Sequence, residues 1–214
     1  MSFVLYGYWR SGTSYRTRIA LNLKGCAYEQ APVDLRAGTH RADAFLALNP
    51  QGMVPALATP GGVLIQSPAI LEWLEETVPS PPLLPTEPFA RAQVRAMAAI
   101  VACDIHPLNN LRVLKSLKHD LAATDEQVAG WTARWITAGF TALEPLIERH
   151  GQGYAWGDAP TLADVCLVPQ VYSARRFGVD LAAFPRVVAA ADQAAAHPAF
   201  AAAHPDRQPD ADGA

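Results

Sequence analysis

Apolar and polar positions in the first 78 residues follow two alternating patterns. Short runs rich in apolar, aromatic and β-branched residues predict strands at 3–8, 28–33, 55–58 and 63–65. Apolar residues at helical spacing predict helices at 13–24, 41–47 and 67–77. Strands that alternate with helices are typical of an α/β unit, so we expect a mixed sheet in this part of the chain.

The pattern changes at residues 79–88, which hold five prolines in ten positions. Proline lacks a backbone N–H and interrupts helices, so this stretch predicts a linker. Everything after it has helical spacing, beginning with one long Ala- and Leu-rich run from Ala90 to Lys118 that should kink at Pro107. Later helices are predicted to start at Thr124, at a structural cap formed by Thr161 and Asp164, and at Phe184.

These patterns divide the chain into four expected parts. They are an α/β domain over 1–78, a linker over 79–88, an all-helical domain over 89–203 and a tail over 204–214. The tail is polar, contains prolines and has no apolar periodicity. We therefore expect it to be loose.

Composition narrows the possible functions. Half of the 214 residues are apolar and 17% are charged, which is ordinary for a globular protein. The net charge of −3 and pI of about 6.0 argue against nucleic-acid binding. Residues 1–42 nevertheless hold six cations against two acids, and a locally basic segment suits an anionic ligand. A solvated helix face remains the alternative explanation for some of these cations.

The three cysteines, Cys26, Cys103 and Cys166, lie far apart without metal-ligand spacing. This argues against a disulfide framework and against a structural metal site. No apolar run reaches transmembrane length, and the first residues lack the pattern of a signal peptide. We expect a cytoplasmic protein that does not bind membranes.

The most specific chemistry lies at Ser11-Gly12-Thr13-Ser14, between the first predicted strand and helix. A helix N-terminus offers unpaired N–H groups and a partial positive charge, which hold an anion. Taken alone, Ser14 is more often an N-cap and Gly12 a turn residue. Two further segments change that balance.

One is Asn49–Leu57, in which a turn leads through Val54-Pro55 into a strand. If that peptide bond is cis, the polar backbone groups of Val54 face outward and pair with a peptide-like ligand. The other is Val63–Ile70, where Ser67 is the expected N-cap and Pro68 the first helical residue. A helix start of this kind also binds a carboxylate.

Together these segments resemble the zeta class of the glutathione transferases over almost the whole chain. The resemblance rests on SGTSYRTRIAL, NPQGMVPAL, QSPAILEWLEE and DIHPLNNLRVL, which begin at residues 11, 49, 66 and 104. One departure is that Gly12 and Thr13 stand where the family usually has Ser and Cys, so no cysteine contributes at position 13.

The resemblance implies a thioredoxin-like N-terminal domain, an all-α C-terminal domain, glutathione as the cofactor and a homodimer. It implies catalytic roles for Arg10, Ser11, Thr13 and Ser14. The implied glutathione contacts are His40, Gln51, Val54, Pro55, Gln66, Ser67 and His106. The implied substrate contacts are Arg10, Asn110, Arg112 and Arg176, with His106 and Asn110 four apart on one helix face.

The activity implied is glutathione-dependent cis–trans isomerisation of a maleyl keto diacid, with maleylacetoacetate as the first candidate substrate and maleylpyruvate as the second. Arginines suit such a substrate because guanidinium pairs with carboxylates. A general transferase that conjugates electrophiles is an alternative, but it needs an apolar acceptor pocket. A non-catalytic binding protein of the same fold is the other alternative.

Overall fold

The computed structural model describes residues 3–212 and consists of two compact units. One unit, here the β/α unit, comprises Met1–Pro82 together with Ala196–Ala214. The other, here the helical unit, comprises Leu83–Ala195. The expected order of an α/β part before a helical part is present, but the end of the chain belongs to the first unit.

The β/α unit is built on a four-stranded mixed sheet with the order β2-β1-β3-β4. The strands are β1 (Phe3–Gly7), β2 (Tyr28–Pro32), β3 (Ala56–Thr59) and β4 (Gly62–Ile65). Strand β1 pairs with β2 in parallel and with β3 in antiparallel orientation, so Leu5 lies between Gln30 and Leu57. Leu5 and Leu57 are buried. The predicted mixed sheet is confirmed.

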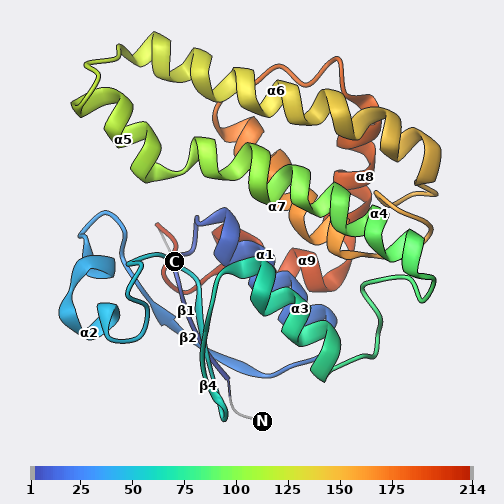
Figure 1. Cartoon of the computed structure of the whole chain (residues 1–214), viewed down its shortest axis with the longest axis horizontal. Coiled ribbons are helices and arrows are strands. Elements are labelled where there is room, and N and C mark those ends of the chain that lie inside the picture. The colour runs from blue at the N-terminus through green and yellow to red at the C-terminus, as the bar shows by residue number, and fades with distance from the viewer. Residues whose placement is uncertain (1–2, 213–214) are drawn as a thin grey trace. The chain divides into compact units, whose positions relative to one another are not determined.

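Helices α1 (Gly12–Leu23) and α3 (Ser67–Thr77) pack against each other in this unit (Figure 1). Ile19 of α1 and Ile70 and Leu74 of α3 are fully buried, as the helical spacing predicts. The short helix predicted at 41–47 is a 3-10 turn, η1 (Thr39–Arg41), followed by α2 (Asp43–Leu46). Its core residue is Phe45.

Three cations on or just after α1 lie inside the unit, where a solvated helix face was the alternative expectation for some of them. Arg16, Arg18 and Lys24 are all buried. Lys24 at the end of α1 forms an ion pair with Glu75 of α3, with Nζ and Oε2 2.6 Å apart, and also donates to the Pro81 carbonyl at 2.7 Å. Burial of the Arg18 and Lys24 charges is possible because both groups are hydrogen-bonded.

The helical unit begins with α4 (Pro88–Ala99). The long run predicted after it is interrupted by a π-helical segment, η2 (Ile100–Ile105), and a 3-10 turn, η3 (His106–Asn109), before α5 (Leu111–His119). Pro107 lies in the 3-10 turn, consistent with its missing N–H. The other helices are α6 (Asp125–His150), α7 (Leu162–Arg176) and α8 (Pro185–Ala196).

Close packing of α6 on the π-helical segment depends on a glycine. A Cβ at Gly139 would lie only 2.2 Å from Cδ1 of Ile105. Among the described residues of this unit, β-type pairing is confined to an isolated bridge between Gly151 and Gly157. The helical character predicted after the linker is therefore confirmed.

The start of α7 has the predicted capping box. The Asp164 side chain, 0% exposed, accepts hydrogen bonds from the backbone N–H and hydroxyl of Thr161 and from the N–H of Ala155, at 2.7–2.9 Å. Burial raises the pKa of Asp164 to about 6, although these donors act in the opposite direction.

The end of the chain differs from the expected loose tail. Helix α9 (Pro198–Ala203) packs on α1, and a 3-10 turn, η4 (Pro205–Arg207), follows it (Figure 1). Phe200 is fully buried and the Gln208 side chain is hydrogen-bonded to the carbonyls of Ala202 and His204. Residues 213–214 of the expected tail lie outside the described residues. None of the helices within 3–212 is long and apolar enough to span a bilayer.

Candidate functional site

The turn between β1 and α1 carries a partly exposed hydroxyl, that of Ser11. Ser11 is the N-cap of α1, and its Oγ accepts a hydrogen bond from the Ser14 N–H at 3.3 Å. Its carbonyl accepts from the Tyr15 N–H at 2.8 Å, and its own N–H donates to the Tyr8 carbonyl at 3.0 Å. The Ser11 side chain is therefore held at a helix start, where the partial positive charge is greatest.

Thr13 connects this turn to the second predicted segment. Its hydroxyl donates to the Val54 carbonyl at 3.0 Å and lies 2.9 Å from the Ser11 Oγ. A threonine hydroxyl has one proton, so while that proton lies on Val54 the Ser11 hydroxyl must donate to Thr13. The three groups form a chain of hydrogen bonds that ends on the backbone of the Val54-Pro55 turn.

Ser14 lies in a different environment from Ser11 and Thr13. It is 0% exposed, and its Oγ accepts from the Tyr8 N–H at 3.3 Å. A Cβ at Gly7 would lie 3.1 Å from that oxygen, so glycine suits the tight packing there. This position fits a structural role for Ser14 better than the predicted catalytic one.

The Val54-Pro55 peptide bond is cis. The expected outward orientation of both Val54 polar groups is only partly consistent with the structure, because the carbonyl accepts from Thr13. Gly52, just before it, has φ +60° and would place a Cβ 3.1 Å from the His40 carbonyl. The predicted His40 and Val54 segments therefore meet at Gly52.

The start of α3 is open. The N-cap is Gln66 with Ser67 as the first helical residue, so the prediction of Ser67 as N-cap is wrong by one position. Gln66 has φ 69°, and its side chain makes no capping bond; its Nε2 instead donates to Gln51 Oε1 at 2.5 Å. The first-turn N–H groups of α3 consequently have no side-chain cap, while the Ser67 side chain lies at 3% exposure beside them.

Arg10 lies directly before the Ser11 turn and is half-buried. Its guanidinium carbon lies 5.1 Å from the centre of the Trp9 ring, a cation–π arrangement. No acid among residues 3–212 forms an ion pair with it. Its charge is therefore free to act on an anionic ligand.

In the helical unit, His106 and Asn110 do not share a helix face as predicted. His106 begins the 3-10 turn η3, whereas Asn110 is extended and serves as N-cap of α5, its Oδ1 accepting from the Arg112 N–H at 3.2 Å. Asparagine favours this position because its side chain replaces a missing backbone partner. The α-helical spacing assumed for the pair therefore does not apply.

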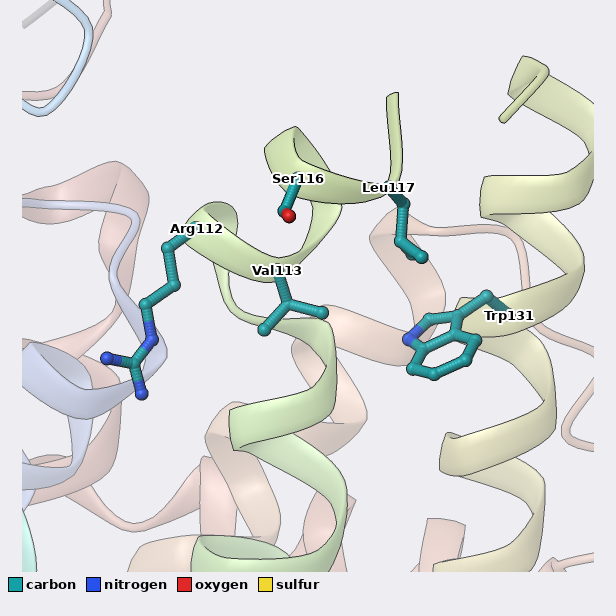
Figure 2. Close-up of a pocket in the computed structure, with 5 residues that line it drawn as sticks. All are labelled: Arg112, Val113, Ser116, Leu117 and Trp131. Atoms are coloured by element: carbon teal, nitrogen blue, oxygen red, sulfur yellow. The ribbon is translucent and has the colours of Figure 1, made fainter. Parts of the chain in front are cut away.

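Arg112 lines a groove of about 440 Å³ between α5 and α6. Figure 2 shows Val113, Leu117 and Trp131 facing one another, with the Arg112 guanidinium extending away at one edge. The Trp131 ring nitrogen donates to the Leu108 carbonyl at 2.9 Å, which fixes the ring. An apolar groove with one cation at its edge suits an amphipathic anion.

Two neighbouring arginines end α7, and the sequence did not distinguish between them. Arg175 forms an ion pair with Asp192, its Nη2 2.9 Å from Oδ1. Arg176 instead lies over the Phe177 ring at 4.2 Å. The two side chains therefore differ in their surroundings, Arg175 at an exposed ion pair and Arg176 at an aromatic ring.

Sequence reasoning missed the groups that hold the backbone of Trp9. Its N–H donates to Asp210 Oδ2 at 3.0 Å, and its carbonyl accepts from the buried guanidinium of Arg18 at 2.8 Å. Asp210 lies 201 positions away in a polar segment without periodicity, so the sequence carries no signal for the contact. The structure shows that the end of the chain packs, since Phe200 and Ala203 of α9 are fully buried.

The arrangement suits an organic anion better than a metal ion. The described residues contain no cluster of His, Cys, Asp and Glu suited to hold a metal. The β/α unit instead offers the Ser11–Thr13 hydroxyls, an open helix start at α3 and a peptide edge at Val54. These groups match a ligand with a thiolate, a carboxylate and a peptide backbone.

Comparison with known proteins agrees with a site for such a ligand in the β/α unit. Residues 1–76 match the family model for the glutathione S-transferase N-terminal domain. Maleylacetoacetate isomerase of Pseudomonas aeruginosa is 55% identical over 212 residues, which cover 96% of this chain and 97% of that protein.

Two solved structures are also similar along nearly their full length. The holo structure of maleyl pyruvate isomerase, a bacterial zeta-class glutathione S-transferase, has a TM-score of 0.95 and 53% identity, covering 98% of this chain and 100% of that one. Maleylacetoacetate isomerase of Methylobacterium extorquens AM1, with bound malonate and glutathione, has a TM-score of 0.93 and 43% identity, covering 98% and 99%.

Proposed function

We propose, because this chain belongs to the zeta class of the glutathione transferases, that it isomerises maleylacetoacetate to fumarylacetoacetate with glutathione as its cofactor. Maleylpyruvate is the second candidate substrate. The chain is a cis–trans isomerase of this family, and the related enzyme of Methylobacterium extorquens has bound glutathione and the dicarboxylate malonate. The finer assignment of substrate and residues is our proposal.

The residues present fit glutathione. The observation that carries this statement is the first turn of α3, where a left-handed Gln66 turns its side chain to Gln51 and leaves the backbone N–H groups uncapped. Such a turn, with the buried Ser67 hydroxyl, binds a carboxylate, for which the γ-glutamyl end is the candidate. Gln51, Gln66 and His40 lie in the same unit as further contacts.

The chemistry that glutathione supplies when bound is a thiolate nucleophile, which converts a cis double bond into a rotatable single bond. The chain must keep that sulfur ionised. Ser11 and the N–H groups of residues 12–14 do so, because a helix N-terminus lowers the pKa of a nearby thiol. The Ser11 proton turns from Thr13 to the sulfur, while Thr13 keeps its bond to Val54. The Val54 N–H is the proposed partner of the cysteinyl backbone.

The arginines hold the substrate carboxylates. Arg10 is the first candidate, since it directly precedes Ser11 and has no acidic partner among residues 3–212. Arg176 and Arg112 are the candidates in the helical unit, with Asn110 as a polar contact and His106 as a glutathione contact. Guanidinium groups suit these roles because they bind carboxylates in a bidentate way.

The test follows loss of the cis isomer of both candidate substrates, with and without glutathione. We expect glutathione-dependent turnover, faster for maleylacetoacetate. Arg10→Ala should raise KM and lower kcat for the diacid, with kcat/KM about 10- to 100-fold lower, and leave glutathione affinity nearly unchanged. Arg134→Ala, at an exposed position of α6, is the matched control.

A neutral diester sharpens this test. The wild type should prefer the diacid, and Arg10→Ala should lose most of that preference. Equal treatment of diacid and diester by the wild type, or loss of glutathione binding in Arg10→Ala, would contradict the assignment of Arg10. A general conjugating transferase would then be the better interpretation.

Two further properties are part of the proposal. We expect a homodimer, as the family resemblance implies; sedimentation at micromolar concentration tests it, and a monomer would contradict it. We also expect a cytoplasmic location, which the three free cysteines support.

A further inference from the structure

The two peptide groups that flank Trp9 are both held by hydrogen bonds, one to the end of the chain and one to Arg18 of α1. Its N–H donates to Asp210 Oδ2 at 3.0 Å. Its carbonyl accepts from Arg18 Nη2 at 2.8 Å, and Arg18 Nε donates to the Ala203 carbonyl of α9 at 3.0 Å. Arg18 is 1% exposed, so this guanidinium is a fixed internal link.

The segment that carries Asp210 is itself anchored. We call residues 204–212 the C-terminal segment. Gln208, 2% exposed, donates to the carbonyls of Ala202 and His204 at 3.1 and 2.6 Å and contacts the Gln30 side chain of β2 at 3.0 Å. Figure 1 shows this segment, in red, returning to the dark blue start of α1.

A second, weaker contact lies two residues further on. Asp212 forms an ion pair with Arg36, in the loop that leads to His40, with a shortest distance of 2.8 Å. Both side chains are about half exposed, so this ion pair contributes little to holding the C-terminal segment in place. The hydrogen bond from Trp9 to Asp210 is the stronger candidate for a functional contact.

We infer that Asp210 is a positioning residue for the Arg10–Ser11 turn, acting through the Trp9 N–H; this inference rests on the proposed role of that turn in glutathione thiolate and substrate binding. A bond between a carboxylate and an N–H is stronger than a neutral one. It fixes the Tyr8–Trp9 peptide, one residue before Arg10. Catalytic groups lose effect when their geometry is displaced by as little as about 1 Å.

This role is separable from stabilisation of the fold. The packing of α9 on α1 uses buried side chains such as Phe200 and Ala203, which precede the C-terminal segment. Asp210 is only partly buried, and its carboxylate accepts a hydrogen bond from the Trp9 N–H. Removing its carboxylate leaves the Arg18 link and the α9 packing in place, so the effect should concentrate on the turn.

The role is also separable from charge. A carboxylate near a thiolate disfavours the thiolate by repulsion, so loss of the Asp210 charge alone should not harm the turn. Asp210→Asn keeps an oxygen acceptor for Trp9 and removes the charge, whereas Asp210→Ala removes both. Asp206→Ala is the matched control, because Asp206 is an exposed acid of the same segment whose carboxylate lies near His204.

The experiment measures three quantities on the full-length protein. They are kcat/KM for glutathione, the pH dependence of the ultraviolet thiolate absorbance of bound glutathione, and hydrogen exchange of the Trp9 amide. In Asp210→Ala we expect kcat/KM to fall about tenfold, the thiol pKa to rise and the Trp9 amide to exchange faster. Asp210→Asn should stay within about threefold of the wild type, and Asp206→Ala should match it.

The inference is overturned if Asp210→Ala matches Asp206→Ala, or if Asp210→Asn is impaired as much as Asp210→Ala. Failure of the proposed function looks different: the wild type itself would then show no thiolate absorbance with glutathione. The Trp9 amide exchange still tests the positioning contact in that case, because it needs no ligand.

Discussion

The starts of α1 and α3 lie in the same unit and use their free N–H groups in opposite ways. At α1, the Ser11 hydroxyl caps the helix and joins Thr13 and the Val54 carbonyl in a chain of hydrogen bonds. At α3, the Gln66 side chain turns away to Gln51 and leaves the first turn without a cap. The first start presents an orientable hydroxyl, and the second presents bare backbone donors.

The difference shows how one fold serves two parts of one ligand. A hydroxyl that can turn its proton suits a sulfur whose ionisation must be controlled. An uncapped helix start suits a carboxylate that is always ionised and needs only a fixed partner. Variants in three places test this division of roles: the ion pair between α1 and α3, the start of α7, and the open start of α3.

The largest effect should come from the ion pair that joins the ends of α1 and α3. Glu75→Ala leaves the Lys24 ammonium, whose side chain is 0% exposed, with only the Pro81 carbonyl. We expect the free energy of unfolding to fall by about 3–5 kcal/mol, as for other buried ion pairs that lose one partner. Urea denaturation measures it.

The double variant Lys24→Met/Glu75→Leu is the control for that experiment. Removing both charges should recover most of the lost stability, because apolar pairs of similar volume replace buried ion pairs well. A loss below about 1 kcal/mol in Glu75→Ala would mean that the pair is not buried in solution.

The start of α7 provides a third case, capped by a buried carboxylate. Asp164→Ala leaves the N–H groups of Ala155 and Thr161 without their acceptor. We expect a loss of about 2–4 kcal/mol in the free energy of unfolding, with glutathione affinity in calorimetry unchanged where the protein is folded. A change in affinity without loss of stability would contradict a purely structural cap.

The same residue should give the protein a measurable pH dependence. The pKa of Asp164 is raised to about 6 in the folded chain from an ordinary value of 3.8. The stability that a raised carboxyl pKa contributes is present below the unfolded pKa and is lost as pH rises through about 6. We expect the wild type to lose about 2 kcal/mol relative to Asp164→Asn between pH 4 and pH 7. Parallel stability curves for the two proteins would contradict this.

The smallest effect is expected at the open start of α3. Ser67→Ala should weaken glutathione binding by about 1–3 kcal/mol in calorimetry, the cost of one hydrogen bond to a charged group. Ser11→Ala is the matched variant at α1; there the thiol pKa of bound glutathione should rise while affinity changes less. If both variants lose affinity equally and neither changes the thiol pKa, the proposed division between the two starts is wrong.

Local signals predicted most of the fold. Helix 67–77 and the capping boxes at Thr124 and Thr161 agree with the structure, because apolar spacing and cap residues act over a few positions. The chain from Ala90 to Lys118 was harder: its breaks depend on a π-helical segment into which α6 packs through Gly139. Nothing within the run itself signals that contact.

The candidate site was also predicted only in part. The family motifs placed Ser11, Thr13, Val54 and the α3 start in one unit, and the hydrogen bond from Thr13 to Val54 connects two of them. They did not predict that Ser14 is interior or that Gln66, not Ser67, precedes the helix. Sequence signals do not locate an N-cap to within one residue, because neighbouring polar residues compete for that role.

The sequence by itself determined the elements, the helix starts and the family, since each depends on local spacing or on contiguous motifs. Only the tertiary structure decided which charges are buried and where the end of the chain lies. Arg18 became an internal link and Asp210 became the partner of Trp9 because the chain returned to its own beginning after 201 positions. A contact of that separation leaves no periodicity in the sequence, and it forms because the backbone groups it satisfies would otherwise lack a partner.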